Sequence, residues 1–135
     1  MKKNNDIKSI LKLDKVVFDT IEFKRLGFKN DNKLKLNLQT EIFQRQDEET
    51  YKVMLHLIGE KEDEYSFDII LSGFFSFRTD ETIEQQLKDE LISSNSVAIL
   101  MPYLRSEVSI LTAQPDVECV VLPVLNVNNM FGHEE

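Results

Sequence analysis

The strongest constraint in this sequence is a strict two-residue alternation of apolar and polar side chains over residues 34–42. Polar residues occupy positions 35, 37, 39 and 41, and the other parity carries Leu34, Leu36, Leu38, Thr40 and Ile42. Because only an extended strand sends alternate side chains to opposite faces, the run predicts a strand with one apolar face. Such a strand needs partner strands for its backbone and a second layer for its apolar face.

Three further strands are predicted around this one. Residues 15–28 are rich in β-branched and aromatic side chains, and apolar residues alternate again over 51–58. The short acidic segment 59–64 predicts a hairpin, so the strand at 65–77 should pair antiparallel with the preceding one. That last strand is apolar on both faces. We therefore expect helices on one face and another layer or another copy of the chain on the other.

The hydrophobic period changes after residue 77. Polar residues at 79–82 can cap a short helix in which Ile83, Leu87 and Leu91 recur at four-residue spacing. Residues 93–96 interrupt this helix and can cap a longer one, which Pro102 kinks or begins and which ends by Pro115. The predicted fold class is α+β: a four-stranded antiparallel sheet followed by a short helix and a long Pro-kinked helix.

Length and charge limit the domain plan and the partners. The 135 residues suit one domain at 15–131, with a flexible N-terminal segment at 1–14 and a disordered tail at 132–135. Residues 1–13 lack the apolar run of a signal peptide, and no 18-residue apolar span is present. Acidic residues outnumber basic ones by 24 to 16, and the net charge of −8 repels phosphate. We expect a cytoplasmic protein that neither binds nucleic acid nor inserts into membranes.

Residues with catalytic or metal-binding chemistry are scattered. His56 lies within a predicted strand far from Ser or Cys neighbours, and His133 lies near the C-terminal end. Cys119 is predicted as a core or half-buried thiol, and the acidic runs at 47–49 and 60–64 lack calcium-loop spacing and are predicted as solvated loops. The sequence therefore predicts no enzyme activity, no metal and no cofactor.

Two motifs resemble the SecB family of protein-export chaperones. Residues 96–109, SVAILMPYLRSEVS, are followed by LPVLNV at 122–127, and FDIILSGFF at 67–75 resembles the fourth strand of the family. The resemblance covers roughly residues 12–131. The positions that carry the two helix and tail motifs are Pro102, Tyr103, Arg105, Pro123 and Asn126.

The resemblance implies a homotetramer, built as a dimer of dimers, that holds unfolded polypeptides without ATP. In the family, an apolar alternation on the second strand contributes to client binding, and here it corresponds to Leu34, Leu36 and Leu38. Alternate positions of the fourth strand contribute to subunit contacts in the family. They correspond to Phe67, Ile69 and Leu71.

The resemblance leaves two kinds of client open. Export chaperones deliver preproteins to the SecA motor of the Sec translocase through an acidic patch on strands one and four. Asp68 matches this patch, whereas Thr20 and Lys24 stand at the corresponding strand-one positions. SecB-like proteins also act as dedicated chaperones for antitoxins in toxin–antitoxin–chaperone systems, and this is the alternative prediction.

Two further hypotheses place the protein outside the chaperone class. A small hot-dog-type enzyme would use an antiparallel sheet and one helix, with Asp68 and His56 as acid or base. In that fold the helix comes early in the chain, whereas here helical spacing follows four predicted strands. The other reading is a binding module that kept the fold and lost client binding.

Overall fold

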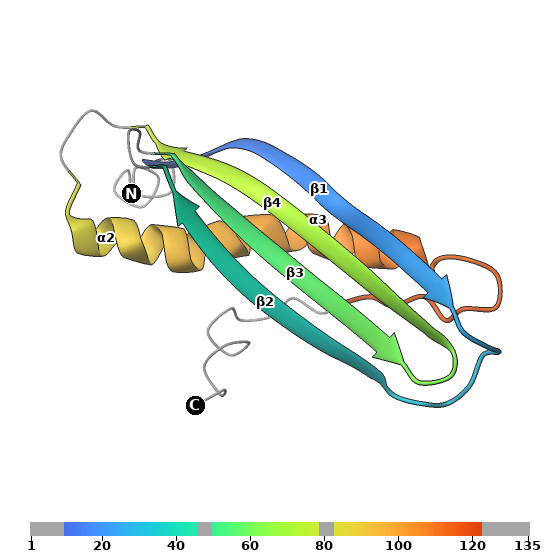
Figure 1. Ribbon diagram of the computed structural model, residues 1–135. Coiled ribbons are helices and arrows are strands. Elements are labelled where there is room, and N and C mark those ends of the chain that lie inside the picture. Colours follow the sequence, from blue (N-terminus) through green and yellow to red (C-terminus); the bar gives the residue numbers. More distant parts are fainter. Residues whose placement is uncertain (1–9, 46–49, 79–82, 123–135) are drawn as a thin grey trace, which may run out of the picture.

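The computed structural model describes residues 10–45, 50–78 and 83–122. In this part of the chain one antiparallel sheet is followed by helical segments, which confirms the predicted α+β class (Figure 1). The elements are β1 (Leu11–Arg25), β2 (Leu34–Gln44), β3 (Tyr51–Lys61), β4 (Tyr65–Phe77), α2 (Gln85–Glu90), η1 (Leu91–Asn95) and α3 (Ser96–Thr112).

The strand order is β1-β4-β3-β2, so the β3–β4 hairpin forms the centre of the sheet and β1 and β2 form its edges. The hairpin turn spans residues 62–64 and begins three residues later than the predicted loop, which starts at residue 59, because β3 continues to Lys61. The connection between β1 and β2 passes the hairpin end to reach the opposite edge (Figure 1). Each edge strand thus presents one unpaired side within the described chain.

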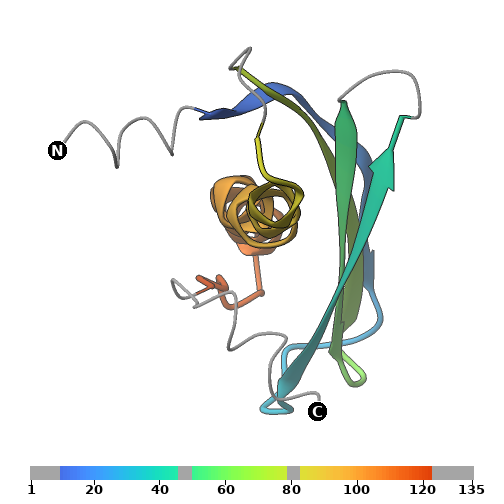
Figure 2. The same cartoon turned by 90° about the vertical axis from the view of Figure 1, so that its left-hand side faces the viewer.

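The helical segments cover one face of the sheet, and the other face is bare of described segments (Figure 2). Helix α3 packs on the two central strands, β3 and β4. Leu100 of α3 lies so close to Gly73 that a Cβ at Gly73 would stand 2.6 Å from the Leu100 Cδ2. The Gly at this position is therefore what lets the helix approach the sheet.

The predicted interruption at residues 93–96 is wrong, because α2, η1 and α3 follow one another without a break. Asn95 has helical backbone angles and makes no side-chain capping hydrogen bond. The segment η1 is instead a π-helical turn, which accommodates one extra residue. The buried residues Ile92 and Val97 are five positions apart, and the wider turn keeps both on the sheet side.

Pro102 lies inside α3, which begins at Ser96, so of the two predicted effects of the proline the start of a helix is excluded, and the kink stays a prediction. The side chain of Pro102 is exposed. The backbone carbonyl that loses its N–H partner there can be hydrated, which limits the cost of the proline. The helix ends at Thr112, before Pro115, as predicted.

The first strand begins at Leu11 rather than at residue 15, so the predicted boundary between residues 14 and 15 falls inside β1. Leu11 and Leu13 pair with Phe77 and Phe75 of β4. A register shift at residue 14 breaks the simple alternation and hides these two leucines from a period-two search. Pro123, Asn126, the predicted tail and the predicted capping residues 79–82 lie outside the described residues.

Candidate functional site

The predicted client-binding leucines lie on the helix side of β2. Leu34, Leu36 and Leu38 are in register with Lys61, Gly59 and Leu57 of β3. Leu34 and Leu38 are half-buried against the core, whereas 44% of Leu36 and 43% of Ile42 in the same row are exposed. The row is open because α3 packs on β3 and β4 and leaves the edge strand largely uncovered.

The backbone of β2 adds a second binding element to this row. One side of β2 pairs with β3, and no described strand pairs with its other side. Such an edge can accept an extended polypeptide as an additional strand while alternate side chains of that polypeptide contact the apolar row. In the middle of the row, the Thr40 Oγ1 is buried without a hydrogen-bond partner in the described structure.

The predicted subunit-contact residues are buried in the core of the single chain. Phe67, Ile69 and Leu71 face α3 from the central strand β4, with exposed fractions of 2%, 0% and 0% within the single chain. A charge at any of them would unfold the protomer rather than only separate copies. Subunit contact at these residues stays a prediction, and exposed apolar side chains elsewhere are better placed for it.

The exposed side of α3 carries such side chains. Tyr103 and Ile110 are seven residues apart on the helix and have exposed fractions of 41% and 64%. Ile110 and Val121, which is 72% exposed, line one hollow of about 440 Å³. Their seven-residue spacing, about two helical turns, could have indicated this stripe from the sequence.

The SecB-like motif on α3 fixes the segment that follows the helix. Arg105 donates from Nε to the carbonyl oxygen of Leu122 at 3.0 Å, and Ser109 Oγ donates to the carbonyl oxygen of Val120 at 3.0 Å. Thr112 Oγ1 accepts a hydrogen bond from the Val120 N–H at 2.8 Å. Side chains of α3 therefore hold the segment that follows the helix against the helix surface.

Asp68 and His56 form a pair on the uncovered face of the sheet. The His56 Nε2 lies 2.7 Å from the Asp68 Oδ1, and both side chains are partly exposed. Glu22 of β1 is in register with Asp68, so two carboxylates share this part of the face. The hot-dog reading predicted this acid and base, yet the pair lies on an open sheet surface and in none of the pockets described here.

The acidic hairpin at residues 62–64 contains a buried ion pair that the sequence reading missed. Lys61 and Glu64 contact at 2.8 Å, and Glu64 is fully buried, so the prediction of a solvated loop is wrong for Glu64. The Glu64 carboxylate also accepts a hydrogen bond from the Asn30 N–H, and its backbone carbonyl accepts bonds from the N–H groups of Leu26 and Gly27. This residue ties the β1–β2 connection to the hairpin and so positions the start of β2.

Both members of this pair have shifted pKa values. Burial raises the pKa of Glu64, but the hydrogen bonds from Lys61 and Asn30 outweigh it and hold the pKa below its ordinary value of 4.5. The hydrogen bond to Glu64 raises the pKa of Lys61 above its ordinary value of 10.5, against the opposing effect of burial. The pair is therefore ionised at neutral pH.

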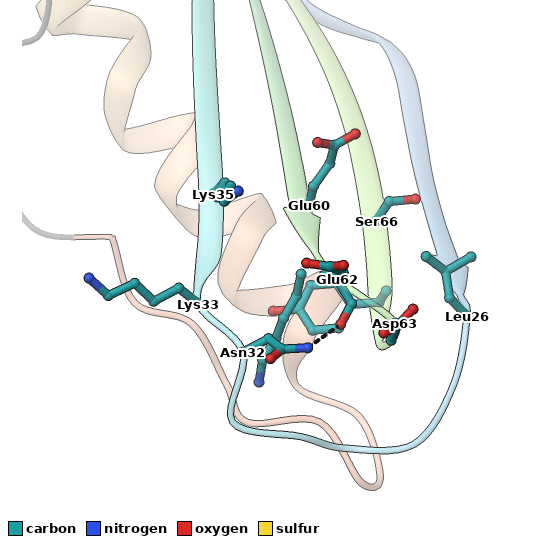
Figure 3. Close-up of a pocket in the computed structure, with 10 residues that line it drawn as sticks. Leu26, Asn32, Lys33, Lys35, Glu60, Glu62, Asp63 and Ser66 are labelled. Carbon is teal, nitrogen blue, oxygen red and sulfur yellow. Dashed lines mark hydrogen bonds between the residues drawn. The ribbon is translucent and has the colours of Figure 1, made fainter.

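A hollow of about 540 Å³ opens beside this hairpin (Figure 3). Lys33 and Lys35 line it together with Glu60, Glu62 and Asp63, and Asn32 donates to the Glu62 carbonyl oxygen at 2.8 Å. Charges of both signs face the same space, so the lining favours neither an anion nor a cation. We therefore interpret the residues that line this hollow as anchors of the surrounding loops.

The remaining chemistry of the described residues is sparse. Cys119 is exposed, and the prediction of a buried or half-buried thiol is wrong because the returning segment lies on the surface of α3. Within residues 10–45, 50–78 and 83–122, no group of three His, Cys, Asp or Glu side chains could hold a metal ion. No helix in the described part of the chain has the length and apolar character needed to cross a bilayer.

Comparison with solved structures defines the class of fold. The chain superposes on the SecB-like chaperone Rv1957 of Mycobacterium tuberculosis, solved with a ChAD peptide from the Rv1956 HigA1 antitoxin. The TM-score is 0.72, and the match covers 93% of this chain and 99% of that chain at 12% sequence identity. The chain therefore has a SecB-like fold, as its motifs predicted.

Sequence comparison places the chain in a family. It is 34% identical over 111 residues to the uncharacterized protein MJ0357 of Methanocaldococcus jannaschii, with 76% of this chain and 68% of that protein covered. The chain belongs to the family of this archaeal protein. No established family model matches the sequence.

Proposed function

We propose that this protein is an ATP-independent chaperone of the SecB type that holds non-native polypeptides along β2. The observation that carries the proposal is the exposed apolar row of β2 beside an unpaired strand edge, within a SecB-like fold. Non-native polypeptides expose extended apolar segments. Such a segment can pair its backbone with β2 and bury side chains against Leu36 and Ile42, at about 25 cal/mol per Å² of apolar surface removed from water.

An antitoxin is the client that we favour over preproteins in general. The solved structure with a similar fold holds a peptide from an antitoxin. A dedicated client also suits a short binding row. Binding one client segment with optimised contacts needs fewer contacts than holding many different long chains, which depends on multivalent binding. A toxin–antitoxin gene pair beside the gene for this protein would support an antitoxin as the client.

Delivery to the Sec translocase is the second candidate, and one observation favours it. Glu22 and Asp68 are cross-strand neighbours on the uncovered face and form an acidic pair on strands β1 and β4. Purified SecA should bind the chaperone, and Glu22→Gln with Asp68→Asn should weaken that binding. Unchanged binding by the double variant would remove this candidate site.

We further propose that the protein is a homo-oligomer in the cytoplasm, assembled through the exposed side of α3. Tyr103 and Ile110 are large apolar side chains at helical spacing, with Val121 beside them. Exposed apolar groups in this arrangement favour packing against the same helix of a second copy. A dimer or tetramer in light scattering at tens of micromolar is the expected result.

The functional test is suppression of aggregation. A denatured client diluted into buffer without ATP should stay soluble in the presence of the protein, and Leu36→Ser combined with Ile42→Ser should abolish this effect. Both side chains are more than two-fifths exposed, so the fold should survive. The matched control is Ile21→Ser, which removes a 43% exposed apolar side chain on the same side of the sheet at the opposite edge strand, β1. Full activity of the double variant in a folded oligomer would contradict the proposed site.

A further inference from the structure

The uncovered face of the sheet carries an aromatic and cationic row at the end opposite the hairpin. Phe43 of β2, Lys52 of β3, Phe74 of β4 and Lys15 of β1 are successive cross-strand partners, so the row spans all four strands. The Lys52 Nζ lies 5.6 Å from the Phe43 ring centroid and 6.0 Å from that of Phe74. The Lys15 Nζ lies 5.7 Å from the Phe74 ring centroid.

The row is hollowed and accessible. Phe43, Lys52 and Phe74 line a depression of about 430 Å³, and 47% of Phe43 is exposed. Neither Lys15 nor Lys52 forms an ion pair with a carboxylate of the described residues, unlike Lys12, whose Nζ lies 3.5 Å from Asp14. Two ammonium groups that pair with no carboxylate in the described part of the chain therefore border an apolar surface, in a protein whose net charge is −8.

We propose that this row, Phe43–Lys52–Phe74–Lys15, is a docking site for an acidic peptide segment that also carries apolar side chains. Carboxylates of the segment would pair with the two ammonium groups, and its apolar side chains would lie on the ring edges in the depression. Cation–π contacts hold the lysines in place, so little side-chain freedom remains to be lost on binding. The site is separate from the β2 row, which faces the helix side of the sheet.

A nucleic acid is the less favoured occupant of an aromatic and basic sheet surface. Bases bind such surfaces by stacking on free aromatic faces. Here the ammonium groups lie over the Phe43 and Phe74 rings, where a base would stack. The net charge of −8 also repels a phosphate backbone beyond the two lysines, whereas a short acidic segment places its few charges locally.

The test is fluorescence anisotropy with the full-length protein and a labelled seven-residue peptide in which Asp and Glu alternate with Phe and Leu. Lys15→Gln combined with Lys52→Gln should weaken binding about five- to tenfold at low salt. The matched control is Lys24→Gln with Lys35→Gln, the same charge change on β1 and β2 at the hairpin end of the sheet. It should change the affinity less than about twofold, and Lys52→Arg should retain binding.

Three outcomes would overturn the proposal. Equal losses for both lysine pairs would mean diffuse charge attraction, and tighter binding of an oligothymidine of matched charge would mean a nucleic-acid surface. Loss of peptide binding in Leu36→Ser with Ile42→Ser would place the peptide on the proposed chaperone site. We expect that double variant to bind the acidic peptide normally, and the Lys15 and Lys52 variant to suppress aggregation normally, so each site can fail without the other.

Discussion

Two rows on the same side of the sheet look alike in sequence and differ in the structure. Phe67, Ile69 and Leu71 alternate on β4, and Leu34, Leu36 and Leu38 alternate on β2. The β4 row is at most 2% exposed, whereas Leu36 is 44% exposed. The difference comes from position, because β4 lies between two strands under α3 and β2 lies at the edge. Identical alternation thus yields core at the centre of a sheet and an exposed apolar row, the proposed binding surface, at its margin.

The largest expected effect on stability comes from truncating a side chain of the central row on β4. Ile69→Ala should lower the free energy of unfolding by about 3 kcal/mol, because it removes a fully buried side chain and leaves a cavity. Leu36→Ala should cost less than about 1 kcal/mol, since much of the side chain already contacts water. Urea denaturation of both variants measures the contrast. Equal costs would mean that β2 is as much a part of the core as β4.

The next effect concerns the anchor that positions β2. Glu64→Gln should destabilise the protein by about 3 kcal/mol, because it leaves the Lys61 ammonium group buried without its counter-charge. Glu62→Gln, which changes the same charge on an exposed neighbouring residue, is the control and should cost little. Similar stabilities of the two variants would show that the ion pair is not needed to hold the loops.

The same pair predicts a pH dependence. The pKa of Glu64 is lowered on folding, so its stabilisation is present above pH 4.5 and is lost as the pH falls through the folded-state pKa. The pKa of Lys61 is raised, so its stabilisation is present below pH 10.5 and is lost as the pH rises through the folded-state value. The stability difference between the natural protein and Glu64→Gln should therefore begin to shrink as the pH falls below 4.5, the ordinary pKa of Glu. A difference that is constant from pH 7 to pH 3 would contradict this assignment.

Much of the fold could be predicted from local patterns, and the failures have physical causes. Four strands followed by helices could be predicted from the hydrophobic pattern, because alternation indicates β2 and β3, β-branched and aromatic residues indicate β1, and β4 is apolar on both faces. The π-helical turn was not readable, since Ser93 and Asn95 look like capping residues and only contact with the sheet selects a continuous helix. Burial of Glu64 depends on Asn30, which is distant in sequence. The lysine and phenylalanine row depends on the register of four strands, and no local pattern contains it.

A smaller effect on stability is expected on the exposed side of α3. Ile110→Asp should separate the predicted oligomer into smaller species while the circular dichroism spectrum stays unchanged, because the side chain is 64% exposed in the single chain. Ile69→Asp, by contrast, should lose both assembly and fold. Light scattering with circular dichroism distinguishes the two. An Ile110→Asp variant with the mass of the natural protein would place the subunit contact elsewhere.

The central claim is that β2 captures an extended polypeptide at its free edge, and hydrogen–deuterium exchange tests it most directly. Backbone amides of Leu34–Gln44 should exchange more slowly when a client peptide is bound, because a new strand would pair with those N–H groups that have no partner in β3. Amides of β4, which pair with strands on both sides, should be unchanged. Slower exchange in β1 or α3 with none in β2 would contradict the account.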